Sequence, residues 1–431
     1  MQRSKYRLWG GVLVAATTLG LAGAVMAQPG PGGAEPAATD GRRLSDESSS
    51  TQAMFTAVWG SQAASEWVRE HNAALSGQPV APAQGGPAPA TKPAAPTPTT
   101  LPVIASDTTQ LNLTRIPIPP IAGKTASIDI LEVDQDAHLL YVTDRTDNGI
   151  DVFDVSTPSA TYLRTIDVGS GPNGVSVAKN VNEVFAGLNN SDVVAIDINP
   201  DSPTVDTVVA RVNTGGKNRA DEMDYDPKDK KLYVANSDDG IVSVIDATTN
   251  QIIKKFEDMG EALEQPRYNA GDGMMYLTGS GQNVVFKFDP TSDTLLAKVD
   301  VVDKCNPNGL AINPTTNQAL LGCSNRQQPQ HAVSWDLEAG RVLDTFQQAG
   351  AGDAAFYSPR ADRFFFGASN FFRGGQMAIF SGNPIAFQTN VPTAVGSHGV
   401  AFDETNNIVY TQDQLPNEGA LFSFPLPGAS R

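Results

Sequence analysis

A short apolar motif recurs seven times in the C-terminal part of the chain. Each copy has an aromatic or apolar residue, here called the anchor, between further apolar residues, as in Leu232-Tyr233-Val234. A repeat of about 40–45 residues built from short strands is typical of one four-stranded propeller blade. The sequence therefore predicts an all-β fold, a seven-bladed β-propeller over residues 108–431. Successive anchors are 44, 48, 43, 44, 45 and 45 residues apart, and they are Tyr141, Phe185, Tyr233, Tyr276, Leu320, Phe365 and Tyr410.

Each copy also contains the other strands that a blade needs. An inner strand precedes the anchor, as in Gly399-Val400-Ala401-Phe402, and a turn such as Asp226-Pro227-Lys228-Asp229 joins the two strands with residues that tolerate turn dihedral angles. The last copy has only three strands, but residues 111–118 precede the first inner strand and can supply the missing outer one. We therefore expect an N-terminal strand to close the ring, because closure removes exposed strand edges.

The N-terminus has the pattern of an export signal. Arg3, Lys5 and Arg7 precede an apolar stretch that ends in Val25-Met26-Ala27, which is typical of a signal peptide and its cleavage site. We predict a signal peptide over residues 1–27 and a periplasmic or secreted protein. An uncleaved membrane anchor is the alternative, but glycine and threonine residues within the stretch weaken a permanent span. After cleavage we expect no membrane span.

Residues 28–107 lack the pattern of a folded domain. They are rich in proline, alanine, glycine and threonine, and such segments bury too little apolar surface to offset the entropy of ordering. We predict a flexible arm with one possible helix over residues 48–75, where Met54, Val58 and Trp67 recur at helical spacing. A helix that docks on the propeller or a partner, and an unattached tether, both remain open.

Charge and cysteine content restrict the possible partners and the compartment. The net charge of −17 and the pI near 4.6 argue against a nucleic-acid partner, because phosphate binding needs lysine and arginine. We expect a monomer that binds a small molecule or a protein ligand. The two cysteines, Cys305 and Cys323, suit one disulfide in an oxidising compartment, and the predicted hairpin between them brings them within bridging reach. Two free thiols are the alternative.

Two copies of the motif resemble a known propeller repeat. Tyr233-Val234-Ala235-Asn236, and Tyr141-Val142-Thr143-Asp144 followed by residues 150–154, look like the YVTN-type repeat. The resemblance covers roughly residues 110–428 and implies the propeller fold. It implies no single function, because similar repeats occur in surface proteins, periplasmic binding propellers, haem d1-type propellers and lactonase-like enzymes. The sequence contains no CxxCH motif for haem attachment.

A second and fainter resemblance concerns two asparagines. Pro307-Asn308-Gly309-Leu310 is similar to a segment of the gluconolactonase and senescence-marker propellers, in which the asparagine is a ligand of a divalent metal. Pro172-Asn173-Gly174 is a looser copy. The resemblance implies that Asn308 and Asn173 are candidate metal ligands.

Polar residues recur just before the inner strands, where a propeller chain passes the mouth of the central channel. We expect these side chains to converge there as a ligand-binding ring, to which Glu222 can be added. Converging carboxylates repel one another unless a cation or a shared proton neutralises them. In the fourth copy the turn is interpreted as one residue shorter, so Gln265 or Pro266 takes this position. The residues twelve positions before the other six anchors are Asp129, Asn173, Asp221, Asn308, Asp353 and His398.

Two functions are compatible with this ring. The first is a non-catalytic ligand-binding or protein-interaction module that uses the polar mouth. The alternative is a metal-dependent hydrolase of the lactonase type, with Asp353 or His398 as general base and Arg267 as the stabiliser of an oxyanion. In that hypothesis a divalent ion such as Ca²⁺ takes oxygen ligands from Asp129, Asn173, Asn308 and Asp353. The same aspartates and asparagines can also simply cap turns.

Overall fold

The computed structural model describes most of the predicted propeller. Contacts divide the chain into two units, Met1–Thr99 and Thr100–Arg431, and every described residue belongs to the second. The predicted signal peptide and the possible helix over residues 48–75 lie outside the described residues. The described ranges are 107–119, 127–324, 330–350, 352–370, 374–394, 396–413 and 419–428.

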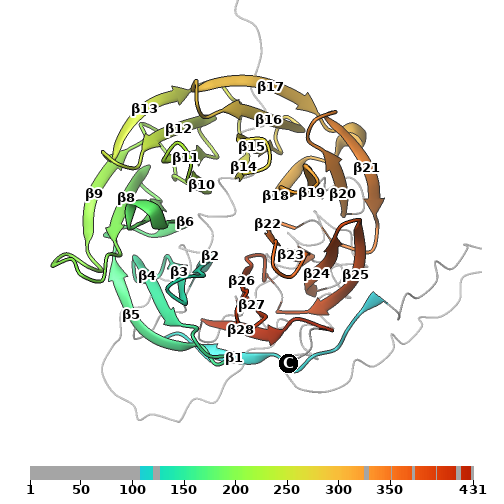
Figure 1. Cartoon of the computed structure of the whole chain (residues 1–431), viewed down its shortest axis with the longest axis horizontal. Helices are drawn as coiled ribbons and strands as arrows, with labels where there is room; N and C mark the ends of the chain where they lie inside the picture. The colour runs from blue at the N-terminus through green and yellow to red at the C-terminus, as the bar shows by residue number, and fades with distance from the viewer. Residues whose placement is uncertain are drawn as a thin grey trace, which may run out of the picture. The chain divides into compact units, whose positions relative to one another are not determined.

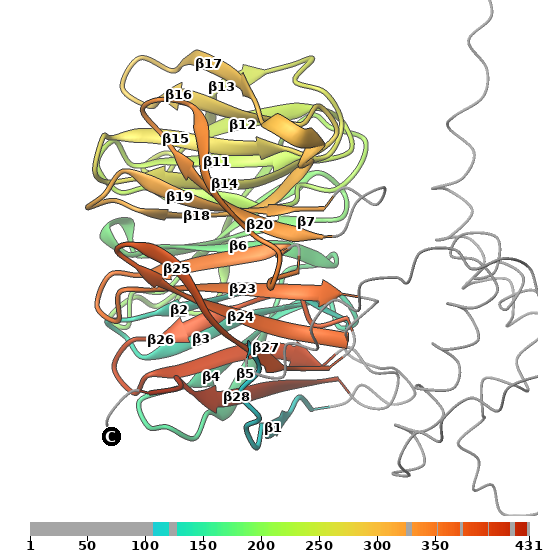
Figure 2. The same ribbon diagram turned by 90° about the vertical axis from the view of Figure 1, so that its right-hand side faces the viewer.

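The described residues form seven four-stranded antiparallel sheets around one axis (Figure 1). This confirms the predicted seven-bladed propeller. The blades are named 1 to 7 in chain order of their innermost strands. The innermost strand of each blade lies nearest the central axis in Figure 1, and Figure 2 shows the propeller from the side. These strands are β2 (Ile128–Asp134), β6 (Pro172–Ala178), β10 (Met223–Asp226), β14 (Leu263–Asn269), β18 (Pro307–Asn313), β22 (Ala354–Ser358) and β26 (Ala401–Asp403).

The second and third strands form the middle of each blade and are almost entirely buried. The second strands, which carry the anchors, are β3 (Leu139–Asp144), β7 (Glu183–Leu188), β11 (Lys231–Asn236), β15 (Met274–Gly279), β19 (Gln318–Cys323), β23 (Arg363–Asn370) and β27 (Ile408–Asp413). The third strands are β4 (Gly149–Asp154), β8 (Asp192–Asp197), β12 (Ile241–Asp246), β16 (Val284–Asp289), β20 (His331–Asp336), β24 (Gly374–Gly382) and β28 (Ala420–Pro425).

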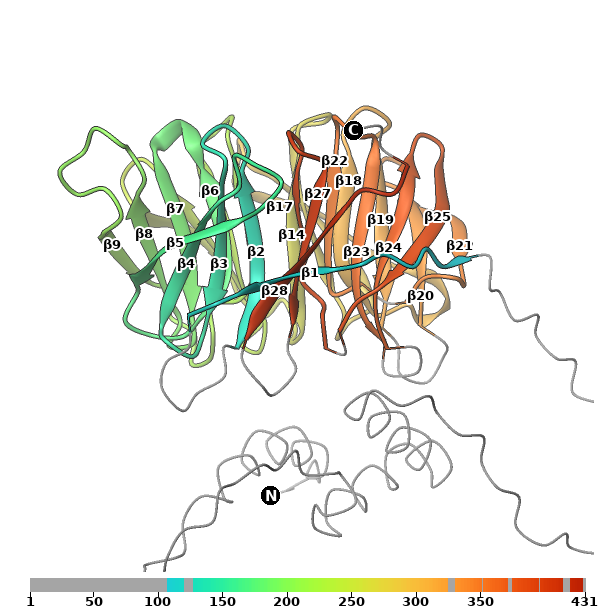
Figure 3. The same cartoon turned by 90° about the horizontal axis from the view of Figure 1, so that it is seen from below.

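The outermost strand of blade 7 comes from the other end of the propeller sequence. Strand β1 pairs antiparallel with β28, with Thr114 opposite Ser423 and Pro117 opposite Ala420 (Figure 3). The predicted closure by an N-terminal strand is therefore confirmed, and the ring leaves this blade no open edge. The outermost strands are β5 (Thr161–Asp167), β9 (Val208–Asn213), β13 (Gln251–Phe256), β17 (Thr294–Asp300), β21 (Arg341–Phe346), β25 (Ile385–Pro392) and β1 (Thr114–Pro117). Two short 3-10 helices, η3 (Lys179–Val181) and η4 (Val302–Lys304), lie in connections.

The core of the propeller lies between neighbouring blades. Seven apolar clusters among the described residues each combine side chains of two adjacent blades. Between blades 6 and 7, for example, the rings of Phe365 and Phe402 stack with centroids 4.6 Å apart. All seven anchors are fully buried in these layers. The anchors therefore recur because every blade must cover the face of the next one.

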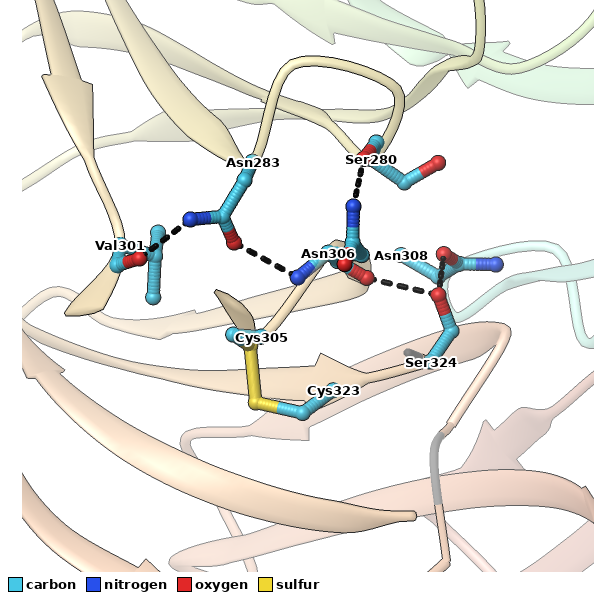
Figure 4. The surroundings of a disulfide bond; sticks show 8 residues. All are labelled: Ser280, Asn283, Val301, Cys305, Asn306, Asn308, Cys323 and Ser324. Atoms are coloured by element: carbon cyan, nitrogen blue, oxygen red, sulfur yellow. Dashed lines mark hydrogen bonds between the residues drawn. A yellow bond between two sulfur atoms is a disulfide. The ribbon is translucent and has the colours of Figure 1, made fainter. Parts of the chain in front are cut away.

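Cys305 and Cys323 form a disulfide in blade 5 (Figure 4). The bond joins the segment leading into β18 to the end of β19, as the sequence predicted. Asn306 beside it donates its amide N–H to Oδ1 of Asn283 (2.7 Å), and Ser324 Oγ donates to the carbonyl oxygen of Asn306 (2.7 Å). The disulfide and these bonds together fix the loop that presents Asn308. Within the described ranges, the structure has no helix long and apolar enough to span a bilayer.

Candidate functional site

The ladder register is the same in all seven blades, and it defines which residues face the channel mouth. In every blade the anchor pairs with the residue nine positions before it, as in Glu132 opposite Tyr141 and Arg267 opposite Tyr276. The turn after β14 therefore has the usual length. The residue twelve positions before the fourth anchor is Glu264, and the assignment of Gln265 or Pro266 to this place was wrong.

A polar cavity of about 320 Å³ lies at this mouth. Six blades contribute to it, and it contains six of the predicted site residues. Asn173, Gln265 and Arg267 are not among its lining residues. The cavity is lined by Asp129, Ile130, Arg145, Arg219, Asp221, Glu222, Glu264, Asn308, Asp353 and His398.

Asp129 lies at the centre of a network that joins blades 7, 1 and 2. Its Oδ1 lies 2.8 Å from Nε2 of His398, and its Oδ2 accepts a hydrogen bond from the terminal nitrogen of Arg145. The Nε of Arg145 donates to Oδ1 of Asn173 (2.8 Å). The other ring nitrogen of His398 lies 2.8 Å from the carbonyl oxygen of Gly396. Both ring nitrogens of His398 thus face oxygen atoms.

Blades 5 and 6 continue the network. The side-chain amide of Asn308 donates to Oδ1 of Asp353 (3.0 Å), and Oδ2 of Asp353 lies 4.0 Å from Nε2 of His398. The Asp353 side chain is the most open of these acids, with 42% of its surface exposed. Five of the seven ring positions are therefore linked by side-chain contacts across blade boundaries.

Arg219 and Asp221 form the side of the mouth that belongs to blade 3. The Nε of Arg219 donates to Oδ2 of Asp221 (2.8 Å). The terminal amino groups of Arg219 donate to no other described residue, so they remain available to a ligand. Burial raises the pKa of Asp221, and the nearby Arg219 and Arg145 only partly oppose this effect.

The four predicted metal ligands are arranged for hydrogen bonding to protein groups. Asp129 is bound by Arg145 and His398, and Oδ1 of Asn173 accepts from Arg145. Oδ1 of Asn308 accepts from Ser324 Oγ (2.6 Å), so its amide nitrogen points to Asp353. Among the described residues, no three histidine, cysteine, aspartate or glutamate side chains converge as ligands of one ion. This arrangement does not fit the predicted calcium site.

A second cavity of about 190 Å³ lies deeper in the channel. Its polar wall includes Glu132, Glu222, Asp224 and Arg267, and Glu222 lines both cavities. Arg267 donates to the carbonyl oxygens of Pro266 (2.7 Å) and Ala355 (3.2 Å). The predicted catalytic group is therefore divided, with Asp353 and His398 at the mouth and Arg267 among the lining residues of the inner cavity.

The side chain of Gln265, which was predicted to bind a ligand, instead binds backbone groups of neighbouring blades. Its Oε1 accepts from the backbone amides of Leu310 (2.9 Å) and Ala355 (3.1 Å). The side chain thereby ties blade 4 to blades 5 and 6 on the wall of the inner cavity. Such a cross-blade bond explains why a polar residue is buried here.

Buried glutamates give the channel unusual acidity. Burial, reinforced by Asp353 and Asp221, raises the pKa of Glu264 to about 8. Burial and the neighbouring Asp224 raise the pKa of Glu132 to about 8. Burial also raises the pKa of Glu222 well above its ordinary value, although Arg267 opposes the effect. With pKa values of about 8, Glu264 and Glu132 are mainly protonated at neutral pH.

Sequence reasoning missed Arg145, Arg219 and Glu264. A signal for two of them is present, because the residue four positions after an anchor contacts the residue twelve positions before it. Arg145 contacts Asp129, and Ser280 Oγ donates to Oε1 of Glu264 (2.9 Å). Ser324 and Asn308 repeat the pattern in blade 5. Arg219 precedes the ring position of blade 3 and follows no such pattern.

Comparisons with known proteins support the fold. No family model matches the chain, and no curated protein matches it. Among solved structures, a chain of a mitotic checkpoint complex is similar, with 15% sequence identity and a TM-score of 0.59. The match covers 80% of this chain and 100% of that one. At this identity the likeness shows the β-propeller fold alone. Fold and site together define a β-propeller with a polar cavity at the mouth of its channel.

Proposed function

We propose that the protein is an exported ligand-binding propeller whose channel mouth holds a small polar ligand. The observation that carries this proposal is the 320 Å³ cavity, which is lined by charged side chains of both signs. Ligand sites of a few hundred Å³ with convergent polar groups are typical of small-molecule binding. Asp353 and the terminal amino groups of Arg219 are open to such a ligand, while Asp129 and Arg145 hold the wall in place.

Two features of the chain, its N-terminal sequence and its disulfide, support export. The N-terminal sequence has the pattern of a signal peptide, and the disulfide Cys305–Cys323 suits an oxidising compartment. The YVTN-type repeat resemblance belongs to the same proposal, since periplasmic binding propellers are among the proteins with such repeats.

Binding has better support than metal-dependent hydrolysis. A lactonase-type site needs oxygen ligands free to receive the ion, but Asp129 and Asn173 both engage Arg145. Arg267, the predicted oxyanion stabiliser, donates to two backbone carbonyls of the inner cavity wall. We therefore place the hydrolase second.

A thermal-shift screen of small polar compounds tests the proposal. The Asp353→Asn variant removes an open mouth carboxylate without changing its shape, and Asp201→Asn changes an exposed acid in the loop between β8 and β9 as a matched control. A compound that binds at the mouth should bind D353N at least about tenfold more weakly, which is about 1.4 kcal/mol. It should bind D201N like the parent. A ligand that binds D353N with unchanged affinity would place its site elsewhere.

A further inference from the structure

The carboxyl group of Glu222 accepts no hydrogen bond from the described residues, although Glu222 is one of the buried acids of the channel. Only 8% of the residue is exposed, and it lines both the mouth cavity and the inner cavity. Its backbone carbonyl accepts from Ala235, but no described residue donates a hydrogen bond to its carboxyl group. Such a group, directed into a cavity, is available to a ligand.

The surroundings of Glu222 contain more acids than cations. In the inner cavity Glu132, Glu222 and Asp224 share one guanidinium, that of Arg267. Two donors of Arg267 are already given to backbone carbonyls, and Asp224 already accepts from the amide of Tyr268 (2.6 Å). On the mouth side Asp221, Glu264 and Asp353 add further acid groups, and Arg145 and Arg219 are the arginines that line this cavity. A cation entering from the mouth would therefore favour the ionised form of these carboxyl groups.

The geometry favours an organic cation over a metal ion. A metal ion needs several ligands converging within bonding distance, and the described residues offer no such group of three. An ammonium group needs only two or three acceptors in a cavity wide enough for its carbon chain. The two cavities, of about 190 and 320 Å³, provide that width.

We infer that the channel ligand carries an ammonium group, which Glu222 binds where the mouth cavity meets the inner cavity. This inference rests on the proposed ligand-binding function and specifies the chemistry of the ligand. The remainder of the ligand lies toward Arg219, Asp353 and His398 at the mouth. Burial raises the pKa of the Glu222 carboxyl well above its ordinary value, so an ammonium group bound beside it favours the ionised carboxylate and the release of its proton to solvent.

Matched pairs of simple probes test the inference. Ethanolamine and putrescine carry ammonium groups, while ethylene glycol and 1,4-butanediol have hydroxyl groups in the same places. At constant ionic strength and neutral pH, we expect an ammonium probe to raise the melting temperature and its hydroxyl partner to leave it unchanged. Titration calorimetry in buffers of different ionisation enthalpy should show net proton release when an ammonium probe binds.

Two variants assign the effect to the carboxyl group. Glu222→Gln retains the shape of the protonated acid and should fold, but it should weaken ammonium binding at least tenfold and abolish proton release. Glu261→Gln, an exposed glutamate near the start of β14, should bind like the parent. Equal binding of the hydroxyl probes, unchanged binding by E222Q, or no binding of ammonium probes at millimolar concentration would each overturn the inference. If polar compounds bind in a way that D353N weakens and E222Q does not, the proposed function stands and the ammonium assignment fails.

Discussion

Nε2 of His398 in blade 7 lies 2.8 Å from Oδ1 of Asp129 in blade 1, although 269 residues separate them in the sequence. The contact joins the first and last blades at the channel mouth. At the outer rim of blade 7, β1 joins them a second time by pairing with β28. The ring is thus closed both at the centre and at the circumference, and the ligand cavity lies directly over the inner closure.

Removing this contact should destabilise the propeller. Both side chains are largely buried, with 16% and 13% of their surfaces exposed, and loss of one partner of a charged hydrogen bond costs about 1–3 kcal/mol. We expect His398→Ala to lower the free energy of unfolding by this amount in urea titrations. Asp129→Asn should also destabilise, and the double variant should lose less than the sum of the two. Strictly additive losses would show that the two residues do not interact.

The buried glutamates predict that stability falls as pH rises. Glu264 and Glu132 have pKa values of about 8 in the folded protein, against an ordinary value of 4.5. The folded state therefore keeps these protons in a range where the unfolded state has released them. Their contribution is fully present below pH 4.5 and is lost as pH rises to about 8, by an amount on the order of a few kcal/mol per group.

Melting temperatures measured from pH 5 to pH 8.5 test this sign. The melting temperature of the parent should fall progressively across this range. Acids whose pKa is lowered by folding change the stability in the opposite direction, but they do so at lower pH. Glu264→Gln and Glu132→Gln, which remove the titration, should each flatten the profile and gain stability at pH 8. Glu338→Gln, an exposed control after β20, should leave the profile unchanged. A parent profile that rises toward pH 8 would contradict the assignment.

The sequence was sufficient to predict the ring but only part of the mouth. Anchor spacing predicted seven blades, because each blade must bury the same central position against its neighbour. The three-stranded last copy predicted closure by β1. Glu264 was missed because the fourth turn was read as shorter than it is, and a strict count of twelve from Tyr276 leads to it.

The direction of long side chains was beyond sequence reasoning. Arg145 leaves the end of β3 and reaches both Asp129 and Asn173, so an arginine of one blade neutralises an acid that seemed free to bind a metal. Arg267 was expected at the mouth, but it lies nine positions before its anchor, three residues along the inner strand from the mouth position. The offset along the strand places Arg267 among the lining residues of the inner cavity and not of the mouth cavity.

Chelation should not alter the stability of the protein. Asp129 is already bonded to Arg145 and His398, and Asp353 accepts a hydrogen bond from Asn308, so these carboxylates have protein partners without a divalent ion. We expect the melting temperature to be the same with EDTA as with added calcium. Elemental analysis of the purified protein gives a second measurement. A clear increase in melting temperature with calcium, lost in the D353N variant, would restore the hydrolase hypothesis.

Gly309 is predicted to control the spacing of blades 5 and 6. Its amide donates to the carbonyl oxygen of Gly352 (3.0 Å), and a Cβ at this position would lie 2.7 Å from that oxygen and 2.8 Å from the carbonyl oxygen of Asp353. Backbone atoms cannot move aside as a flexible side chain can, so Gly309→Ala should force the two inner strands apart. Overpacking of this kind costs about 1–3 kcal/mol.

The neighbouring Asn308→Ala variant separates this steric effect from the loss of a side-chain bond. It removes only the contacts with Asp353 and Ser324, and it should cost about 1 kcal/mol in urea unfolding. G309A should cost more, and it should also weaken ligands of the mouth, because Asp353 is attached to the displaced strand. If G309A unfolds at the same urea concentration as the parent, the inner strands of blades 5 and 6 do not approach each other as closely as the hydrogen bond between Gly309 and Gly352 indicates.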